Sequence, residues 1–221
     1  MSSNSSREAA SYVKPLLIGI TGGIGSGKST LSALLRKKGF RVFDCDAYTR
    51  RMTRKGSPLL KELAAQFGES VITKDGRLNR KRLARAAFAD PVSTEKLNSM
   101  MHGEVLQGMR DFREKEGNRT NAPSLVFAEI PLLYEAGWER YVDSVWLVTA
   151  DEEIRRRRVK DRDPSISDED VEARMARQLP EEYKKERAER IFVNDGTVEE
   201  LEGALDLALS ELFAQGCGKS L

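Results

Sequence analysis

The sequence is poor in the residues that build disulfide frameworks and zinc sites. Its 221 residues contain two cysteines, Cys45 and Cys217, and a single histidine, His102. The cysteines lie far apart, one directly after an apolar run and one in a Gly-flanked C-terminal tail, so a disulfide framework is not expected. A lone histidine cannot complete a zinc site. This cysteine usage predicts a reducing cytosol as the compartment.

Strong net charge and long apolar runs are also missing. There are 37 Lys and Arg residues against 35 Asp and Glu residues, a formal charge of +2, which argues against a protein that coats nucleic acid or an anionic membrane. Residues 1–14 lack a signal-peptide core, and no run approaches the roughly 20 apolar residues of a membrane helix. We expect a cytoplasmic globular protein after a loose N-terminal tail, with neither nucleic acid nor membrane as partner.

Short apolar runs dominate what is present. Most are continuous, which is typical of strands buried on both faces of a parallel sheet. They cover Leu16–Ile20, Arg41–Phe43, Leu125–Ala128, Val145–Val148 and Ile191–Val193. Segments with helical spacing alternate with them, so the pattern predicts an α/β fold with a doubly wound, parallel, five-stranded sheet.

One interval interrupts this alternation. About eighty residues between the second and third strands are predicted to be wholly helical, with helices over Ser57–Phe67 and Asn79–Phe88 and a longer one beginning at Asp90-Pro91. The Met and Leu stripe of the longer helix is interpreted as core. We therefore predict a helical insert at about 51–119 within a core of about 15–50, 120–153 and 190–213.

The segment after the first strand is a phosphate-binding loop. Gly22–Ser29 fits the pattern GxxxxGK[ST] between a strand and a helix. Glycines let backbone N–H groups wrap phosphates closely, and the following helix adds its positive N-terminal end. The nucleotide-binding residues expected here are Gly23, Ile24, Gly25, Ser26, Gly27, Lys28, Ser29 and Thr30, with Lys28 at the β and γ phosphates and Ser29 on Mg²⁺. The alternative is a Gly-rich turn without a ligand.

Two signatures of other phosphate-loop proteins are missing. No Asn is followed by Lys, so the guanine-reading NKxD of GTPases is missing, and the third strand ends Ala128-Glu129-Ile130 without the Asp-Glu of motor ATPases. A small-molecule kinase remains, and such an enzyme needs an acceptor-activating carboxylate and a lid that excludes water.

Candidate carboxylates and a basic helix follow two of the strands. Asp44 and Asp46 are expected on one side of an extended chain at the sheet edge, where one accepts the acceptor's proton and the other holds Mg²⁺ through water. Alternatively, one caps the next helix. Arg155, Arg158 and Arg162 share a helix face suited to phosphate, in a predicted lid at about 154–180. The alternative there is a solvated face of Glu–Arg pairs.

Together these motifs resemble the dephospho-coenzyme A kinase family over about residues 16–213. The resemblance rests on Ile18–Thr30, Asp44-Cys45-Asp46, Leu78-Asn79-Arg80, Pro131-Leu132-Leu133, Arg158 with Arg162, Gln178, and Asn194 with Gly196. Two positions depart from the family pattern, because His102-Gly103 stands where the family has His-Pro and Glu129 where an Asp is common.

The resemblance implies a kinase that transfers the γ-phosphoryl group of ATP to the ribose 3′-hydroxyl of dephospho-coenzyme A, with Mg²⁺. It implies Asp46 as the base, with Lys28 and Arg158 neutralising charge and Asn194 at the nucleotide. The expected acceptor contacts are Asp44, Asp46, Arg80, His102, Leu132, Leu133 and Arg162, and the expected metal contacts are Ser29 and Asp44. We expect a monomer or weak homo-oligomer. A nucleoside or nucleotide kinase and a nucleotide switch are the alternative functions.

Overall fold

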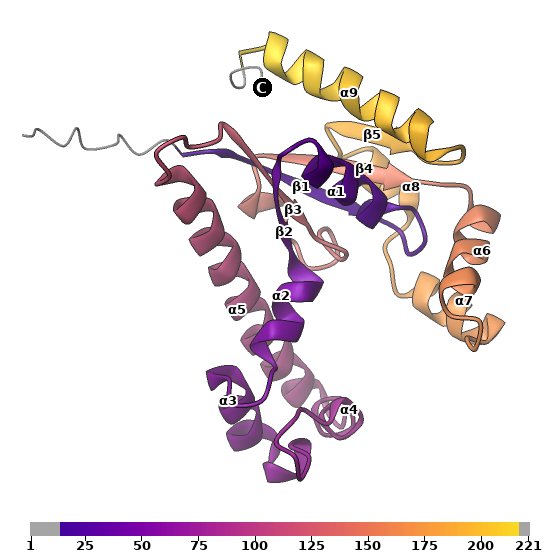
Figure 1. Ribbon diagram of the computed structural model, residues 1–221. Helices are drawn as coiled ribbons and strands as arrows, with labels where there is room; N and C mark the ends of the chain where they lie inside the picture. The colour runs from indigo at the N-terminus through magenta and orange to yellow at the C-terminus, as the bar shows by residue number, and fades with distance from the viewer. Residues whose placement is uncertain (1–13, 217–221) are drawn as a thin grey trace, which may run out of the picture. The chain divides into compact units, whose positions relative to one another are not determined.

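The computed structural model describes residues 14–216, so most of the predicted tail and Cys217 lie outside the described residues. The chain forms two compact units. The core unit comprises the chain up to Phe43 and from Phe112 onward, and the insert comprises Asp44–Asp111. Figure 1 shows the order of the elements along the chain.

The sheet has the five strands predicted, in the order β2-β3-β1-β4-β5. Their bounds are β1 Leu16–Gly22, β2 Arg41–Asp44, β3 Leu125–Glu129, β4 Ser144–Thr149 and β5 Arg190–Val193. Strand β1 pairs in parallel with β3 and with β4, and β4 pairs in parallel with β5. All residues of β3 are buried, which confirms that a continuous apolar run indicates a strand covered on both faces.

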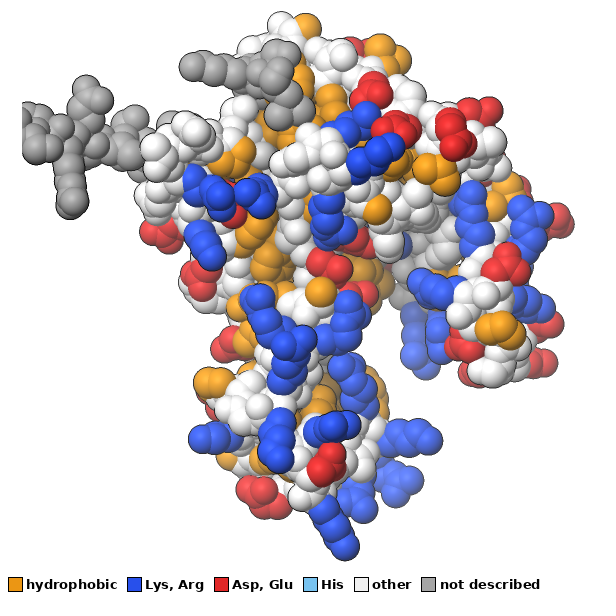
Figure 2. All heavy atoms as spheres, in the orientation of Figure 1, with side chains coloured by type: hydrophobic (Ala, Val, Ile, Leu, Met, Phe, Trp, Pro, Cys, Tyr) orange, Lys and Arg blue, Asp and Glu red, His pale blue; other side chains and the backbone are white. Residues whose placement is uncertain are grey.

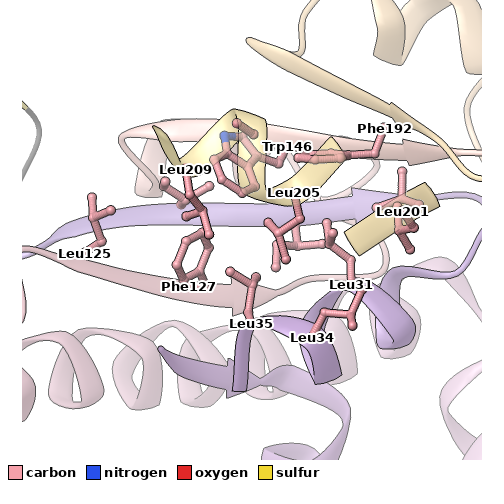
Figure 3. Packing of buried hydrophobic residues seen from close by; sticks show 14 residues of the cluster. Leu31, Leu34, Leu35, Leu125, Phe127, Trp146, Phe192, Leu201, Leu205 and Leu209 are labelled. Atoms are coloured by element: carbon pink, nitrogen blue, oxygen red, sulfur yellow. The ribbon is translucent and has the colours of Figure 1, made fainter. Parts of the chain in front are cut away.

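The core unit contains the helices α1 Lys28–Lys37, α6 Glu152–Arg162, α7 Asp168–Ala176, α8 Glu181–Lys185 and α9 Val198–Ala214, with a short 3₁₀ turn at Glu139–Tyr141. Helices α1, α8 and α9 pack on strands of the sheet. Leucines of α1 and α9 meet Phe127, Trp146 and Phe192 of the strands in one buried cluster (Figure 3). A capping box of Thr197 and Glu200 is present at the start of α9, and Ser167 caps α7 by accepting the Asp170 N–H.

The insert is helical, as predicted. Its helices are α2 Cys45–Met52, α3 Pro58–Phe67, α4 Arg80–Ala87 and α5 Pro91–Gly117, the last of which ends in the core unit, with a 3₁₀ turn at Glu69–Val71. Leu59, Leu63 and Leu83 form a buried cluster against which Leu97 and Met101 of α5 pack. The Met and Leu stripe is therefore core.

The His102-Gly103 pair lies inside α5, which continues through both residues. Gly103 has an ordinary helical conformation, and no heavy atom lies within 4 Å of the position that a Cβ would occupy. None of the helices within residues 14–216 is both long and apolar enough to span a bilayer.

Candidate active site

The phosphate loop joins β1 to α1 and is held by close neighbours. Gly25 and Gly27 have φ angles of 77° and 102°, a region that favours glycine. A Cβ on Gly27 would collide with the side-chain amide of Asn194, and one on Gly25 with the backbone of Arg155. The loop therefore requires glycine at these positions for both conformation and space.

Lys28 lies at the junction of loop and helix. Its Nζ donates to the carbonyl oxygens of Gly22 at 2.7 Å and Gly23 at 2.9 Å, which holds the ammonium over the beginning of the loop. Helix α1 starts at Lys28, its N-cap Gly27 makes no side-chain cap, and its first turn contains no acidic residue. The N–H groups at the helix start and the ammonium suit an anion, so the loop fits a nucleotide phosphate.

Ser29 and Glu129 form the pair that suits a magnesium ion. The Ser29 hydroxyl donates to Oε1 of Glu129 at 2.9 Å, and Glu129 ends strand β3 with a buried side chain. Residues 14–216 contain no cluster of three or more His, Cys, Asp or Glu residues able to hold a metal. Mg²⁺ in phosphoryl-transfer sites takes one or two protein ligands plus substrate phosphates and water. Ser29 with Glu129 fits that donor set.

Asn194, expected at the nucleotide, joins the loop to the lid. Its buried side chain donates from Nδ2 to the carbonyl oxygen of Ser26 at 2.8 Å, and its own carbonyl oxygen accepts from Arg158 at 2.9 Å. The side-chain nitrogen therefore holds the loop in shape. Arg158 is fixed at the carboxyl end of β5, whereas Arg162 at the end of α6 is exposed.

The lid residues Gln178 and Arg155 lie against the first residues of the loop. Oε1 of Gln178 accepts the Ile24 N–H at 2.9 Å, and a Cβ on Gly23 would collide with Nη1 of Arg155. The alternative interpretation of the basic helix holds for Arg156, which pairs with Glu152 at 2.7 Å and also with Glu172. The same helix thus carries a loop-facing side and a side of surface ion pairs.

A buried ion pair that the sequence did not predict anchors the lid. Nζ of Lys184 lies 2.6 Å from Oε1 of Glu135, and the Leu179 N–H donates to the same oxygen at 3.0 Å. Lys184 is 2% exposed. Glu135 follows Pro131-Leu132-Leu133, whose Leu132 is 49% exposed while Leu133 is fully buried. Leu133 therefore packs in the core, and Leu132 is the member of the pair with a side chain open to a ligand.

The carboxylates predicted after β2 belong to the insert and differ from expectation in one respect. Asp44 ends β2 and caps α2 by accepting the Ala47 N–H on Oδ1 at 2.7 Å, while Asp46 lies exposed in the first turn of α2. The extended-chain alternation expected for this pair is wrong, because α2 begins at Cys45. Asp44 performs the capping role named as the alternative, and Asp46 keeps an exposed carboxylate.

Two further expected acceptor residues, Arg80 and His102, also lie in the insert. Arg80 is exposed at the start of α4, which Asn79 caps by accepting the Arg82 N–H. His102 is partly buried in α5, and burial lowers the pKa of its imidazole. Lowering favours the neutral ring, so His102 is suited to hydrogen bonding and packing.

Comparisons with known proteins show which sequences and structures this chain is similar to. The profile of the family described as dephospho-CoA kinase matches residues 16–200. A dephospho-CoA kinase from Thermus thermophilus is 46% identical over 198 residues, which cover 90% of this chain and 92% of that protein. One from Symbiobacterium thermophilum is 38% identical over 87% of this chain and 79% of its own.

Solved structures show the same fold. A crystal structure from Thermus thermophilus has a TM-score of 0.78 and 42% identity, covering 90% of this chain and 99% of its own. Shikimate kinase from Acinetobacter baumannii, at 19% identity and a TM-score of 0.51 over 89% of this chain and 94% of its own, shares the fold alone. The family match extends over the phosphate loop, the insert and the lid, and so this chain belongs to the dephospho-CoA kinase family.

Proposed function

We propose that the protein transfers the γ-phosphoryl group of ATP to the ribose 3′-hydroxyl of dephospho-coenzyme A, giving ADP and coenzyme A, the last step of coenzyme A biosynthesis. The observation that carries this proposal is the phosphate loop, with Lys28 hydrogen-bonded over Gly22 and Gly23, in a chain whose family match includes the whole insert. The donor is assigned to the loop and the acceptor to the insert.

The core unit stabilises the transferring group. Lys28 and the N–H groups at the start of α1 bind the phosphates, and Arg158 and Arg162 add charge from the lid, where it is worth most once water is excluded. Ser29 and Asp44, together with Glu129 that accepts a hydrogen bond from Ser29, would hold Mg²⁺, which neutralises phosphate charge when bound. Asn194 keeps the loop in place through Ser26.

The insert supplies the base and the acceptor contacts. Asp46 takes the proton of the 3′-hydroxyl as its oxygen attacks the γ-phosphorus, and the bond from that phosphorus to the β–γ bridging oxygen breaks to release ADP. Arg80 would bind the acceptor's phosphate groups, and His102 would line the acceptor's path together with Leu132 of the core unit. We further propose a cytoplasmic protein that acts as a monomer or weak homo-oligomer.

A coupled assay of ADP release tests the acceptor assignment. Dephospho-coenzyme A should stimulate ADP release and gain one phosphoryl group by mass spectrometry, whereas nucleosides and nucleotides should not. Stimulation by nucleosides alone would replace the proposal with a nucleoside kinase. ADP release that no small acceptor stimulates would indicate a nucleotide switch or ATPase.

Substitution of the base tests the mechanism. Asp46→Asn should lower kcat by about 10²- to 10⁴-fold and leave ATP affinity nearly intact, because it removes proton transfer and no loop contact. Asp75→Asn, at another exposed aspartate of the insert, is the matched control and should keep full turnover. Full turnover in Asp46→Asn would contradict the assignment of the base.

A further inference from the structure

Two cations converge on one residue of the phosphate loop. The Lys28 ammonium lies 2.9 Å from the carbonyl oxygen of Gly23, and the guanidinium of Arg155 lies so close to the α-carbon of Gly23 that a Cβ there would collide with Nη1. The two groups come from different elements, α1 and α6. Both groups can donate hydrogen bonds to an anion bound at this residue.

Arg155 is enclosed, and its charge is weakly balanced. Its side chain is 13% exposed, and its nearest carboxylate oxygen in the described chain belongs to Glu181 at 4.0 Å, the outer limit of an ion pair. Glu181 is itself 2.9 Å from Lys185. Nε of Arg155 is buried without a hydrogen-bond partner among residues 14–216. A buried donor in this condition costs free energy until an acceptor reaches it.

The neighbouring cations are balanced by close carboxylates. A cavity of about 310 Å³ is lined by Gly23, Arg155, Arg156, Gln178, Glu181 and Lys184, among others. Lys184 has Glu135 at 2.6 Å, and Arg156 has both Glu152 and Glu172. Arg155 is therefore the cation in this cavity whose charge lacks a close carboxylate within the described chain, and it is the one that touches the loop.

We propose that Arg155 determines specificity for ATP over ADP by binding the terminal phosphoryl group together with Lys28. Lysines at this loop position reach the β and γ phosphates. Because Lys28 and Arg155 both lie next to Gly23, we place Arg155 at the end of the loop that binds the γ phosphate. The terminal group brings negative charge and several acceptor oxygens, to which a guanidinium can donate two parallel hydrogen bonds. ADP lacks that group and so offers Arg155 no terminal oxygens to accept these hydrogen bonds.

The inference rests on the proposed function only in taking ATP as the phosphoryl donor, so the test omits the acceptor. Calorimetry measures the affinity of the protein for ADP and for a non-hydrolysable ATP analogue. Arg155→Gln should weaken binding of the ATP analogue about tenfold or more and binding of ADP less than about threefold, because the lost charge-assisted bonds go to the terminal phosphate. Arg157→Gln, at an exposed arginine of the same helix, is the matched control and should change neither affinity.

Three outcomes overturn the proposal: equal weakening for both nucleotides, no weakening for either, or the same change in the Arg157 variant. If Arg155→Gln does not fold, Arg155→Lys keeps a cation and removes the two-pronged donor. The ratio of analogue to ADP affinity should then fall at least about threefold, and an unchanged ratio overturns the proposal. A wild-type protein that binds both nucleotides but does not phosphorylate dephospho-coenzyme A would refute the proposed function and leave the role of Arg155 standing.

Discussion

The core unit and the insert use charge in opposite ways. Residues 44–111 carry thirteen Lys and Arg against nine Asp and Glu, a net +4, whereas the rest of the chain carries twenty-four against twenty-six, a net −2. Figure 2 shows Lys and Arg side chains crowded over the insert. The net charge of +2 is therefore an average of two unlike regions.

The placement of individual charges differs as well. Lys184 in the core unit is buried against Glu135, and Arg155 is largely enclosed at the phosphate loop. Arg77 in the insert pairs with Asp75, but their side chains are 79% and 61% exposed. Buried charges of the core fix positions, whereas exposed charges of the insert create a positive field at its surface, which suits the polyanionic acceptor proposed above.

The largest predicted effect on stability comes from breaking a buried charge pair of the core. Lys184→Met should lower the free energy of unfolding by about 3–5 kcal/mol, because it leaves the Glu135 carboxylate buried without its cation. Chemical denaturation followed by circular dichroism measures the change. The double variant Glu135→Gln/Lys184→Met should recover most of the loss, since a neutral amide replaces the uncompensated charge and its oxygen can still accept the Leu179 N–H.

Two control variants test whether exposed charge pairs contribute less to stability than the buried pair of the core. Lys185→Met changes the next residue of α8, whose side chain is 38% exposed, and Arg77→Met breaks the exposed pair of the insert. Both should leave the unfolding midpoint unchanged within error, because exposed pairs contribute little. A loss in Arg77→Met equal to that in Lys184→Met would show that the two regions do not differ in this way.

We expect packing between helices to stabilise the insert. Substitutions at two glycines of α5 test this expectation. Gly108 lies against the ring of Tyr48 on α2, where a Cβ would collide, whereas Gly103 faces open space. Gly108→Ala should cost about 1–3 kcal/mol through overpacking. Gly103→Ala should add about 0.5–1 kcal/mol, because alanine loses less backbone entropy in a helix. Thermal unfolding of both variants measures the difference, and a destabilising Gly103→Ala would mean that glycine is needed there.

The sequence predicted features that depend on local chemistry. The apolar runs located all five strands to within two residues. The caps at Ser167 and Thr197 are local in the same sense, because a cap is set by residues three apart. The phosphate loop was predicted for the same reason, since its glycines and lysine are contiguous.

Features that depend on distant segments were missed. Nothing in the charged run around Lys184 distinguishes it from Lys185, yet one is buried against Glu135 and the other is not. Asp44 and Asp46 were expected on an extended chain, but the capping bond from Ala47 starts a helix between them. Helical periodicity alone did not predict which arginine of α6 faces the loop, because that depends on how the lid folds back.

The smallest predicted effect is a pH response confined to the insert, which holds the single histidine of the sequence. Burial lowers the pKa of His102 below its ordinary value of 6.5, so the unfolded chain takes up the proton first as the pH falls. Stability should therefore be unaffected by His102 above about pH 7 and should decline as the pH falls below about 6.5. His102→Gln should show a smaller decline when unfolding midpoints are compared across that range. Ordinary carboxylates titrate well below this pH range, so they add little to the decline. Equal declines in the two proteins would therefore mean that the imidazole is as easily protonated in the folded insert as in the unfolded chain.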